Sequence, residues 1–210
     1  MGRLVSVTSA ADTGRRKRMP RAARKAQMLA VAEEVFGERG YLAASMDEIA
    51  ERVGVSKPML YEYFGSKEGL LVGCIDKART ELREATEQAV IHADSPESML
   101  RLGLLAFFRF IAERRQSYGL LRHEAAVTVA SAVEEIEAIR RQQTDLMIGW
   151  MGLSLPGADP LELEAAAEIL VGSCERLAQW CERRPEVTPE RATDLLMTAV
   201  WTGLSSRAGD

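Results

Sequence analysis

The chain has 210 residues, of which 47% are hydrophobic and 28% are charged, and its formal net charge is −4. These values are those of an ordinary soluble globular protein. No apolar run reaches the roughly 20 residues that a membrane-spanning helix needs, and none of signal-peptide length follows the N-terminus. We therefore expect a cytoplasmic protein without a membrane partner.

The residues give no sign of catalysis or metal binding. The cysteines, Cys74, Cys174 and Cys181, lack metal-ligand spacing, and the two histidines form no HExxH-type pair. Gly-rich phosphate loops and the GxSxG and CxxC motifs are also missing from the sequence. We expect neither an enzyme nor a metal or other cofactor. The cysteines are interpreted as buried reduced thiols, with a redox sensor as the alternative.

Charge is distributed unevenly along the chain. Residues 1–70 hold 12 Lys/Arg and 9 Asp/Glu, whereas residues 71–210 carry a negative excess. Residues 1–19 lack hydrophobic periodicity and are predicted to be a disordered basic arm. Four cations concentrate there: Arg15, Arg16, Lys17 and Arg18. The arm is either a solvated leader or a segment that seeks DNA.

Signals for helix starts and ends punctuate the N-terminal third. Apolar residues recur at helical spacing over about residues 21–39, and Gly40 ends that helix. Ser45 and Glu48 form a capping box that begins a second, short helix, and Gly54 ends it. The sequence therefore predicts a long helix followed by a short one.

A third helix follows directly. Ser56 is its N-cap, Pro58 lies in its first turn, and Gly65 ends it. Two short helices joined by a turn at Gly54 form a helix-turn-helix unit. Inward-facing positions are expected at Ile49, Val53, Val55, Leu60 and Tyr63. The side chains expected to meet the DNA major groove are Ser56, Lys57, Met59 and Glu62.

Two further side chains suit contacts with DNA phosphates. The Tyr61 hydroxyl can donate a hydrogen bond to a phosphate. Lys67 adds a cation at the start of the next helix, where the helix N-terminus already favours anions. The alternative for the whole segment is a corner between two helices with a tyrosine-rich apolar patch.

The rest of the chain also shows helical periodicity. Further helices are expected at about 66–91, 97–115, 117–123, 126–151, 160–183 and 188–205, without β-type alternation. The fold class is therefore all-α. The 97–115 helix is apolar on nearly every face except at Arg101 and Arg109, so we expect it to be buried. Arg109 either pairs with a glutamate of another helix or holds an anionic ligand headgroup.

Aromatic and methionine side chains gather on neighbouring helices of this C-terminal part. Such a set suits an adaptable apolar pocket for a small hydrophobic effector, although each member can equally be core. The candidate pocket residues are Phe107, Phe108, Arg109, Ile111, Tyr118, His123, Met147, Trp150 and Met151. In the last two helices, small residues permit close helix approach, opposite bulky ones such as Leu196 and Trp201.

Residues 44–71 read ASMDEIAERVGVSKPMLYEYFGSKEGLL. This segment closely resembles the DNA-binding signature of TetR-family transcriptional regulators: Thr/Ser before the second helix, then Ile-Ala, Gly-Val-Ser, Leu-Tyr-x-Tyr/His-Phe and Ser-Lys-Glu-x-Leu. Every part of that signature is present. The preceding AVAEEVFGERGYLAAS is similar to the family's first helix. The resemblance covers about residues 24–70.

The resemblance implies a homodimer with a helix-turn-helix DNA-binding domain over 20–65 and a helical effector-binding and dimerisation domain over 66–210. The dimer would form through the last two helices, which pair with their two-fold mates. The implied DNA contacts are Ser45, Ser56, Lys57, Pro58, Met59, Tyr61, Tyr63 and Lys67, to which the arm could add a minor-groove contact. The implied function is a repressor that a small molecule releases from an inverted-repeat operator; the alternative is a constitutive DNA-binding dimer without a ligand.

Overall fold

The computed structural model describes residues 19–114, 130–154 and 157–208, and within these ranges it contains helices and no strand. The all-α prediction is confirmed. The helices are α1 (Arg21–Ala43), α2 (Met46–Val53), α3 (Lys57–Phe64), α4 (Lys67–Val90), α5 (Pro96–Glu113), α7 (Ala130–Ser154), α8 (Pro160–Glu182) and α9 (Pro189–Ala208). The helix predicted at 117–123 lies outside the described residues.

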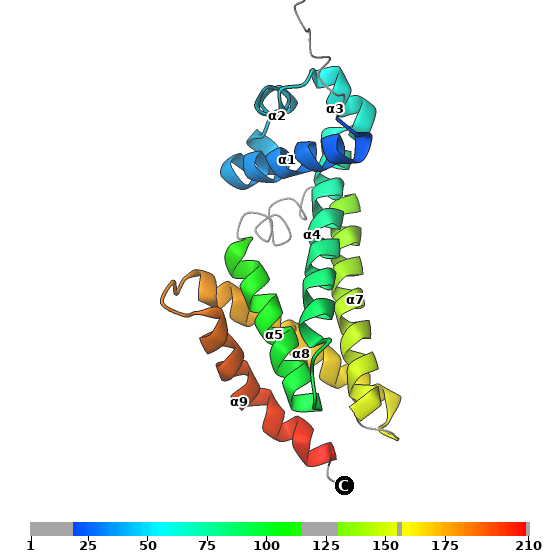
Figure 1. The fold of residues 1–210 in the computed structure, drawn as a ribbon, viewed down its shortest axis with the longest axis vertical. Helices are drawn as coiled ribbons and strands as arrows, with labels where there is room; N and C mark the ends of the chain where they lie inside the picture. The colour runs from blue at the N-terminus through cyan, green and yellow to red at the C-terminus, as the bar shows by residue number, and fades with distance from the viewer. Residues whose placement is uncertain (1–18, 115–129, 155–156, 209–210) are drawn as a thin grey trace, which may run out of the picture.

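The molecule is elongated, with α1, α2 and α3 at one end (Figure 1). Helix α4 runs from that end into the remainder, where it lies beside α7 and packs on α5. Helices α8 and α9 complete the far part, α9 against α5 and α8 against α7. Helix α4 is thus shared by both ends of the molecule.

Local signals shape the N-terminal unit as the sequence predicts. Gly40 leaves the helical conformation with φ 74°, and Gly54 ends α2 with φ 76°, a left-handed conformation that glycine adopts without strain. The Ser45 side chain accepts hydrogen bonds from the backbone N–H groups of Asp47 and Glu48. Only this half of the predicted capping box forms, because the Glu48 carboxylate accepts from Arg52 at 2.6 Å.

Of the serine N-caps of α3, α4 and α5, two accept a capping hydrogen bond with their side chain and one does not. Ser66 accepts a hydrogen bond from the Gly69 N–H at 2.9 Å and so begins α4 as a capped helix. Ser56 occupies the N-cap position of α3, but its side chain makes no capping bond. A capping box that the sequence did not suggest forms between Ser95 and Ser98 at the start of α5.

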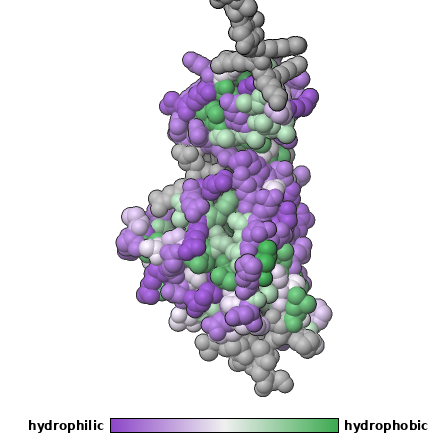
Figure 2. All heavy atoms as spheres, viewed as in Figure 1, coloured by the Kyte–Doolittle hydropathy of each residue, from purple (hydrophilic) through white to green (hydrophobic). Residues whose placement is uncertain are grey.

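Helix α5 is largely buried along its apolar residues, as expected, and it is exposed at the two arginines that interrupt its apolar pattern. Arg101 and Arg109 are exposed there and pair with carboxylates of α9: Asp194 at 2.6 Å and Glu190 at 2.8 Å. The two arginines lie eight positions apart and therefore share one helix face, which lies against the edge of α9. Hydrophilic side chains cover much of the visible face of the molecule, while apolar side chains gather in the middle of its C-terminal part (Figure 2).

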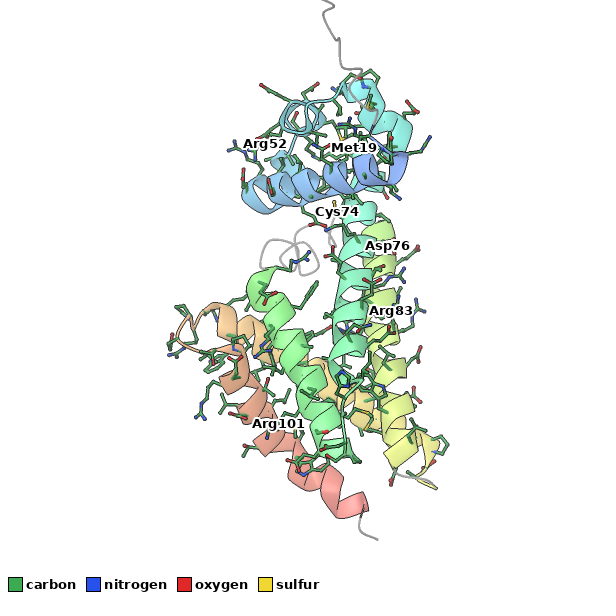
Figure 3. All side chains as sticks on the ribbon, viewed as in Figure 1. Met19, Arg52, Cys74, Asp76, Arg83 and Arg101 are labelled. Atoms are coloured by element: carbon green, nitrogen blue, oxygen red, sulfur yellow. The ribbon has the colours of Figure 1, made fainter. Side chains whose placement is uncertain are left out.

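None of the three cysteines forms a disulfide. Cys74 lies at the junction of α1 and α4 (Figure 3), with its sulfur 3.7 Å from the Leu29 carbonyl oxygen. Burial raises the pKa of Cys74, and it raises the pKa of Cys174 to about 12. Both groups are therefore neutral thiols at physiological pH, a form that reacts slowly with oxidants. None of the helices in the described ranges combines the length and the apolar character that crossing a membrane requires.

Candidate DNA-binding surface and ligand cavity

Helix α3 presents most of its surface to solvent. It is held down by the buried Leu60 and by the half-buried rings of Tyr63 and Phe64. The remaining side chains of α3 and its cap are exposed: Ser56, Lys57, Pro58, Met59, Tyr61 and Glu62. This pattern suits a recognition helix, because the exposed face carries the polar and aromatic groups that can reach base edges and phosphates.

Lys57 joins α3 to α2 through an exposed ion pair. Its Nζ lies 2.9 Å from an Asp47 carboxylate oxygen, and this hydrogen bond raises the pKa of Lys57. Exposed pairs contribute little to stability, so a DNA phosphate or base edge can replace Asp47 at small cost. Lys57 is therefore a cation held in the first turn of α3.

Lys67 has two contacts that its sequence position did not reveal. Its Nζ donates a hydrogen bond to the Leu42 carbonyl at 3.2 Å and lies 4.6 Å from the centre of the Tyr41 ring. Partial burial lowers the pKa of Lys67. The Tyr41 ring itself packs 5.7 Å from Phe36. Lys67 thus connects the first turn of α4 to the end of α1.

Tyr63 lies between the core and the surface. Its ring packs at 6.2 Å from Phe64, and the Arg21 guanidinium lies 4.9 Å above it. Arg21 therefore places a further cation beside α3. It is not among the DNA contacts predicted from the sequence, although the arginines at the start of α1 indicate positive charge there. Ser45 is the cap of α2, as described above, and Arg15, Arg16, Lys17 and Arg18 lie outside the described residues.

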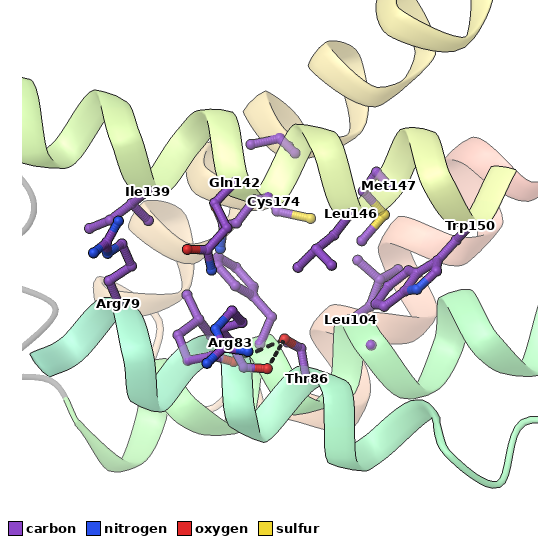
Figure 4. Close-up of a pocket in the computed structure, with 15 residues that line it drawn as sticks. Arg79, Arg83, Thr86, Leu104, Ile139, Gln142, Leu146, Met147, Trp150 and Cys174 are labelled. Carbon is purple, nitrogen blue, oxygen red and sulfur yellow. Dashed lines mark hydrogen bonds between the residues drawn. The ribbon is translucent and has the colours of Figure 1, made fainter. Parts of the chain in front are cut away.

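A cavity lies among helices α4, α5, α7 and α8 (Figure 4). Its volume is about 40 Å³. Pockets that hold drug-sized ligands measure about 300–1,000 Å³, so this one is narrow in the present conformation. The lining residues are Arg79, Leu82, Arg83, Thr86, Gly103, Leu104, Phe107, Ile139, Gln142, Gln143, Leu146, Met147, Trp150, Val171 and Cys174.

Only some of the predicted pocket residues meet in this cavity. Phe107, Met147 and Trp150 line it. Phe108 and Ile111 instead line a separate narrow space against α8 and α9.

The other predicted pocket residues lie elsewhere. Arg109 is exposed and pairs with Glu190, which lowers the pKa of that carboxyl, so the pairing alternative describes this arginine and the headgroup alternative does not. Met151 is half-buried and is not among the residues that line the cavity. Tyr118 and His123 lie outside the described residues. Conversely, the sequence did not predict Arg79 and Arg83 as cavity residues, because the periodicity of α4 indicates only its apolar stripe.

The outer faces of α8 and α9 form an open groove of about 640 Å³. Apolar side chains line it although they face solvent: Ile169 is 66% exposed and Leu195 is 37% exposed. Two small residues, Gly172 and Ser173, also line the groove. Leu196 lines it too but is buried within its own protomer.

An ion-pair chain crosses the junction between the N-terminal unit and the rest. The Glu33 carboxylate of α1 accepts hydrogen bonds from Lys77 of α4 at 3.0 and 3.2 Å. Lys77 also pairs with Glu81 at 3.1 Å, and Glu81 accepts from Arg114 at the end of α5. Desolvation lowers the pKa of Lys77, but its two carboxylate partners outweigh this and raise the pKa overall. Charges therefore link α1, α4 and α5.

Comparison with known proteins identifies both parts of the chain. Residues 28–74 match the bacterial regulatory proteins of the tetR family, and residues 96–203 match the tetracyclin repressor-like C-terminal domain. The HTH-type transcriptional activator FasR of Mycolicibacterium smegmatis is 32% identical over 195 residues, which cover 91% of this chain and 87% of FasR. EthR of the same organism is 27% identical and covers 93% of this chain and 94% of its own length.

Solved structures agree. A TetR-like transcriptional regulator from Rhodococcus sp. RHA1 superposes with a TM-score of 0.72 at 32% identity, covering 90% of this chain and 99% of its own. SmeT, at 23% identity and a TM-score of 0.69 over 84% of this chain and 91% of its own, shares the fold. The resemblance inferred from residues 24–70 is confirmed. The chain belongs to the TetR family of DNA-binding, helix-turn-helix transcriptional regulators, which are not enzymes.

Proposed function

We propose that the protein is a homodimeric repressor that a small apolar molecule releases from an inverted-repeat operator. One observation carries this proposal. Helix α4 is joined tightly to the DNA-binding helices at its start and lines a narrow, largely apolar cavity further along. A ligand that widens the cavity can displace α4, and with it the DNA-binding helices.

The DNA-contacting role rests on the exposed face of α3 and on the cations around it. Lys57 is the first residue of α3, Arg21 lies over the Tyr63 ring of the same helix, and Lys67 begins α4 shortly after it. We propose that Lys57 reaches a base edge and that Lys67 and Tyr61 hold phosphates. The division of the chain at residues 65 and 66 stays a prediction, because α4 packs on helices of both parts.

The dimer is proposed through α8 and α9. An open groove with exposed Ile169 and Leu195 is apolar surface that a second copy of the same face can bury. A two-fold dimer carries two recognition helices, so the operator is an inverted repeat with half-site centres about 34–36 Å, or near multiples of that distance, apart.

The interface is tested with Leu195→Glu and its matched control, Leu161→Glu. Both side chains are exposed and apolar, but only Leu195 lines the groove. Light scattering should show a monomer for the first variant and a dimer for the second. The buried Leu196 is unsuitable for this test, because a charge there disrupts the protomer itself. A dimer that survives Leu195→Glu would refute this interface.

Release requires a ligand that binds the opened state better than the DNA-bound one. A coupling of about 1–3 kcal/mol changes operator affinity roughly 5- to 150-fold, and operator must weaken ligand binding by the same factor. The structures of this fold include SmeT in complex with triclosan, a small aromatic molecule bound by that protein.

The decisive experiment measures both equilibria. Compounds that raise the melting temperature are titrated by calorimetry with and without an operator selected from random oligonucleotides. We expect weaker ligand binding in the presence of operator. Equal affinities would reject ligand-controlled release and leave the constitutive DNA-binding dimer. Leu146→Trp, which places bulk in the cavity lining, should still bind operator but no longer respond to ligand.

A second candidate is an activator, because the relative FasR is a transcriptional activator. The DNA-binding surface and the cavity serve both functions equally. The two differ in whether the bound protein lowers or raises transcription from a promoter that carries the operator. A reporter measured with and without the protein separates them.

A further inference from the structure

We propose that the ligand is an amphiphile whose apolar tail lies in the α4/α5/α7/α8 cavity and whose anionic headgroup binds Arg79 and Arg83. This inference names the ligand class of the cavity and rests on the proposed function. It rests on the difference between the two ends of the cavity, one of which is apolar and the other cationic.

The cavity is elongated along α7. Its lining includes Ile139 near one end and Trp150 at the other (Figure 4), a separation of about 16 Å along a helix that rises about 1.5 Å per residue. Around Trp150 the walls are apolar, with Leu104 and Met147 beside the ring. This end suits a hydrocarbon tail, because apolar groups lose water on entering it.

The other end is polar and cationic. Arg79 and Arg83 project from α4 there, opposite Gln142 of α7 (Figure 4). Among the described residues that line the cavity, none is acidic. A ligand cation would therefore be repelled at this end. A carboxylate or phosphate can instead accept paired N–H bonds from the planar guanidinium groups.

The ion pairs of the two arginines within α4 can give way to a headgroup. Among its contacts, Arg79 pairs with Asp76 at 2.5 Å, and Arg83 pairs with Glu87 at 2.9 Å; both carboxylates lie on α4. The arginine side chains are 30% and 39% exposed, and ion pairs at such exposure are weak. The exposure also sets the orientation of the ligand, with the headgroup near water and the tail inside.

The headgroup position explains how this ligand class acts on DNA binding. Arg79 lies two residues after Lys77, whose Nζ is 3.0 Å from the Glu33 carboxylate of α1. A headgroup on Arg79 therefore binds within one turn of the junction between α4 and the DNA-binding helices. A tail that widens the cavity and a headgroup at the junction act on the same segment of α4.

The test compares amphiphiles that differ only in headgroup. Decanoate, decanol and decyltrimethylammonium are titrated by calorimetry below the concentrations at which they form micelles. Decanoate should bind about tenfold more tightly than the other two, which corresponds to about 1.4 kcal/mol. The preference should weaken as salt is added, since the site is partly exposed.

Variants test whether Arg79 and Arg83 cause the preference for an anionic headgroup. The Arg79→Gln/Arg83→Gln double variant should bind decanoate about tenfold more weakly than wild type while binding decanol equally well. The matched control is Arg101→Gln, an exposed arginine paired with Asp194 and outside the cavity lining, which should change neither affinity. Leu146→Trp should abolish binding of both compounds. Thermal melts establish that each variant folds.

The outcomes separate this inference from the proposed function. Equal binding of decanoate and decanol, no binding of any probe, or a preference that survives the double variant would each overturn the ligand class. Release of operator by an uncharged compound would then leave the proposed function standing. If decanoate binds through the two arginines but operator affinity is unchanged, the ligand class stands and ligand-controlled release fails.

Discussion

The two halves of α4 lie in different surroundings. In the first half, Leu70, Leu71, Cys74 and Ile75 are fully or almost fully buried against the N-terminal helices. In the second half, Arg79, Leu82, Arg83 and Thr86 line the narrow cavity. One continuous helix therefore has a tightly packed end and a loosely packed one.

The difference indicates which part can move. Close-packed interiors transmit displacement rather than absorb it, whereas side chains around a void lack contacts on one side and resist displacement less. The N-terminal helices should follow the first half of α4 as a rigid body. The second half, with the facing side of α7, is where a ligand can change the structure at the lowest cost.

The largest effect is expected from removing packing at the tight end. Leu71→Ala should lower the free energy of unfolding by about 2–5 kcal/mol, because a cavity replaces a fully buried side chain. Leu146→Ala, at the existing cavity, should cost less than about 2 kcal/mol, since fewer contacts are lost there. Urea denaturation followed by circular dichroism measures both. Equal costs would remove the distinction between the two ends.

The next effect concerns the ion pair at the junction. Lys77→Met should cost about 1–3 kcal/mol, because it takes the ammonium group away from Glu33, whose side chain is only 9% exposed. Arg83→Met, which breaks the exposed pair with Glu87, should cost less than about 1 kcal/mol. Similar costs would show that the junction pair contributes no more than a surface pair.

The contribution of the Lys77 ion pair to stability should also depend on pH. The pKa of Lys77 is raised in the folded protein, so its contribution is complete below the ordinary lysine pKa of about 10.4. It is lost as pH rises through the higher folded value. The stability difference between wild type and Lys77→Met should therefore shrink above pH about 10, and a difference that grows there would contradict the pairing.

A moderate effect is expected on DNA binding. Lys67→Ala should lower operator affinity for all sequences and reduce the slope of log affinity against log salt by about 0.9, the value for one phosphate contact. Lys57→Ala should relax the preference at one base position. Fluorescence anisotropy at several salt concentrations measures both. If Lys67 only connects α4 to the Leu42 carbonyl, the slope will stay unchanged while stability falls.

The smallest effect comes from one methyl group at the loose end. A Cβ at Gly103 would lie 3.3 Å from the Trp150 ring, which must shift by a few tenths of an ångström. Gly103→Ala should therefore change stability by less than about 1 kcal/mol. Gly149→Ala meets nothing within 4 Å and should stabilise α7 by up to about 1 kcal/mol. A large loss in the first variant would show that the Trp150 end of the cavity is rigid.

The sequence by itself determined the helices and the DNA-binding unit. Caps, chain-reversing glycines and apolar spacing act within a few residues of each other, so Ser45, Gly54 and Gly65 could be assigned without a structure. The exposed face of α3 could be predicted for the same reason. Helix α3 is short and can bury few side chains, so the others face solvent. The family resemblance rested on this same short segment.

Only the tertiary structure decided the partners of side chains that are distant along the chain. Arg109 and Glu190 are 81 positions apart, and Arg101 and Asp194 are 93 apart, so helical spacing could not show which face of α5 is open. The cavity is likewise a gap left between four packed helices, whose width depends on how their side chains fit together. Periodicity identifies an apolar stripe, but it does not distinguish Phe107 beside that gap from Phe108 one position along. The contact of Lys67 with the Leu42 carbonyl was decided in the same way, by the segment that folding brings next to it.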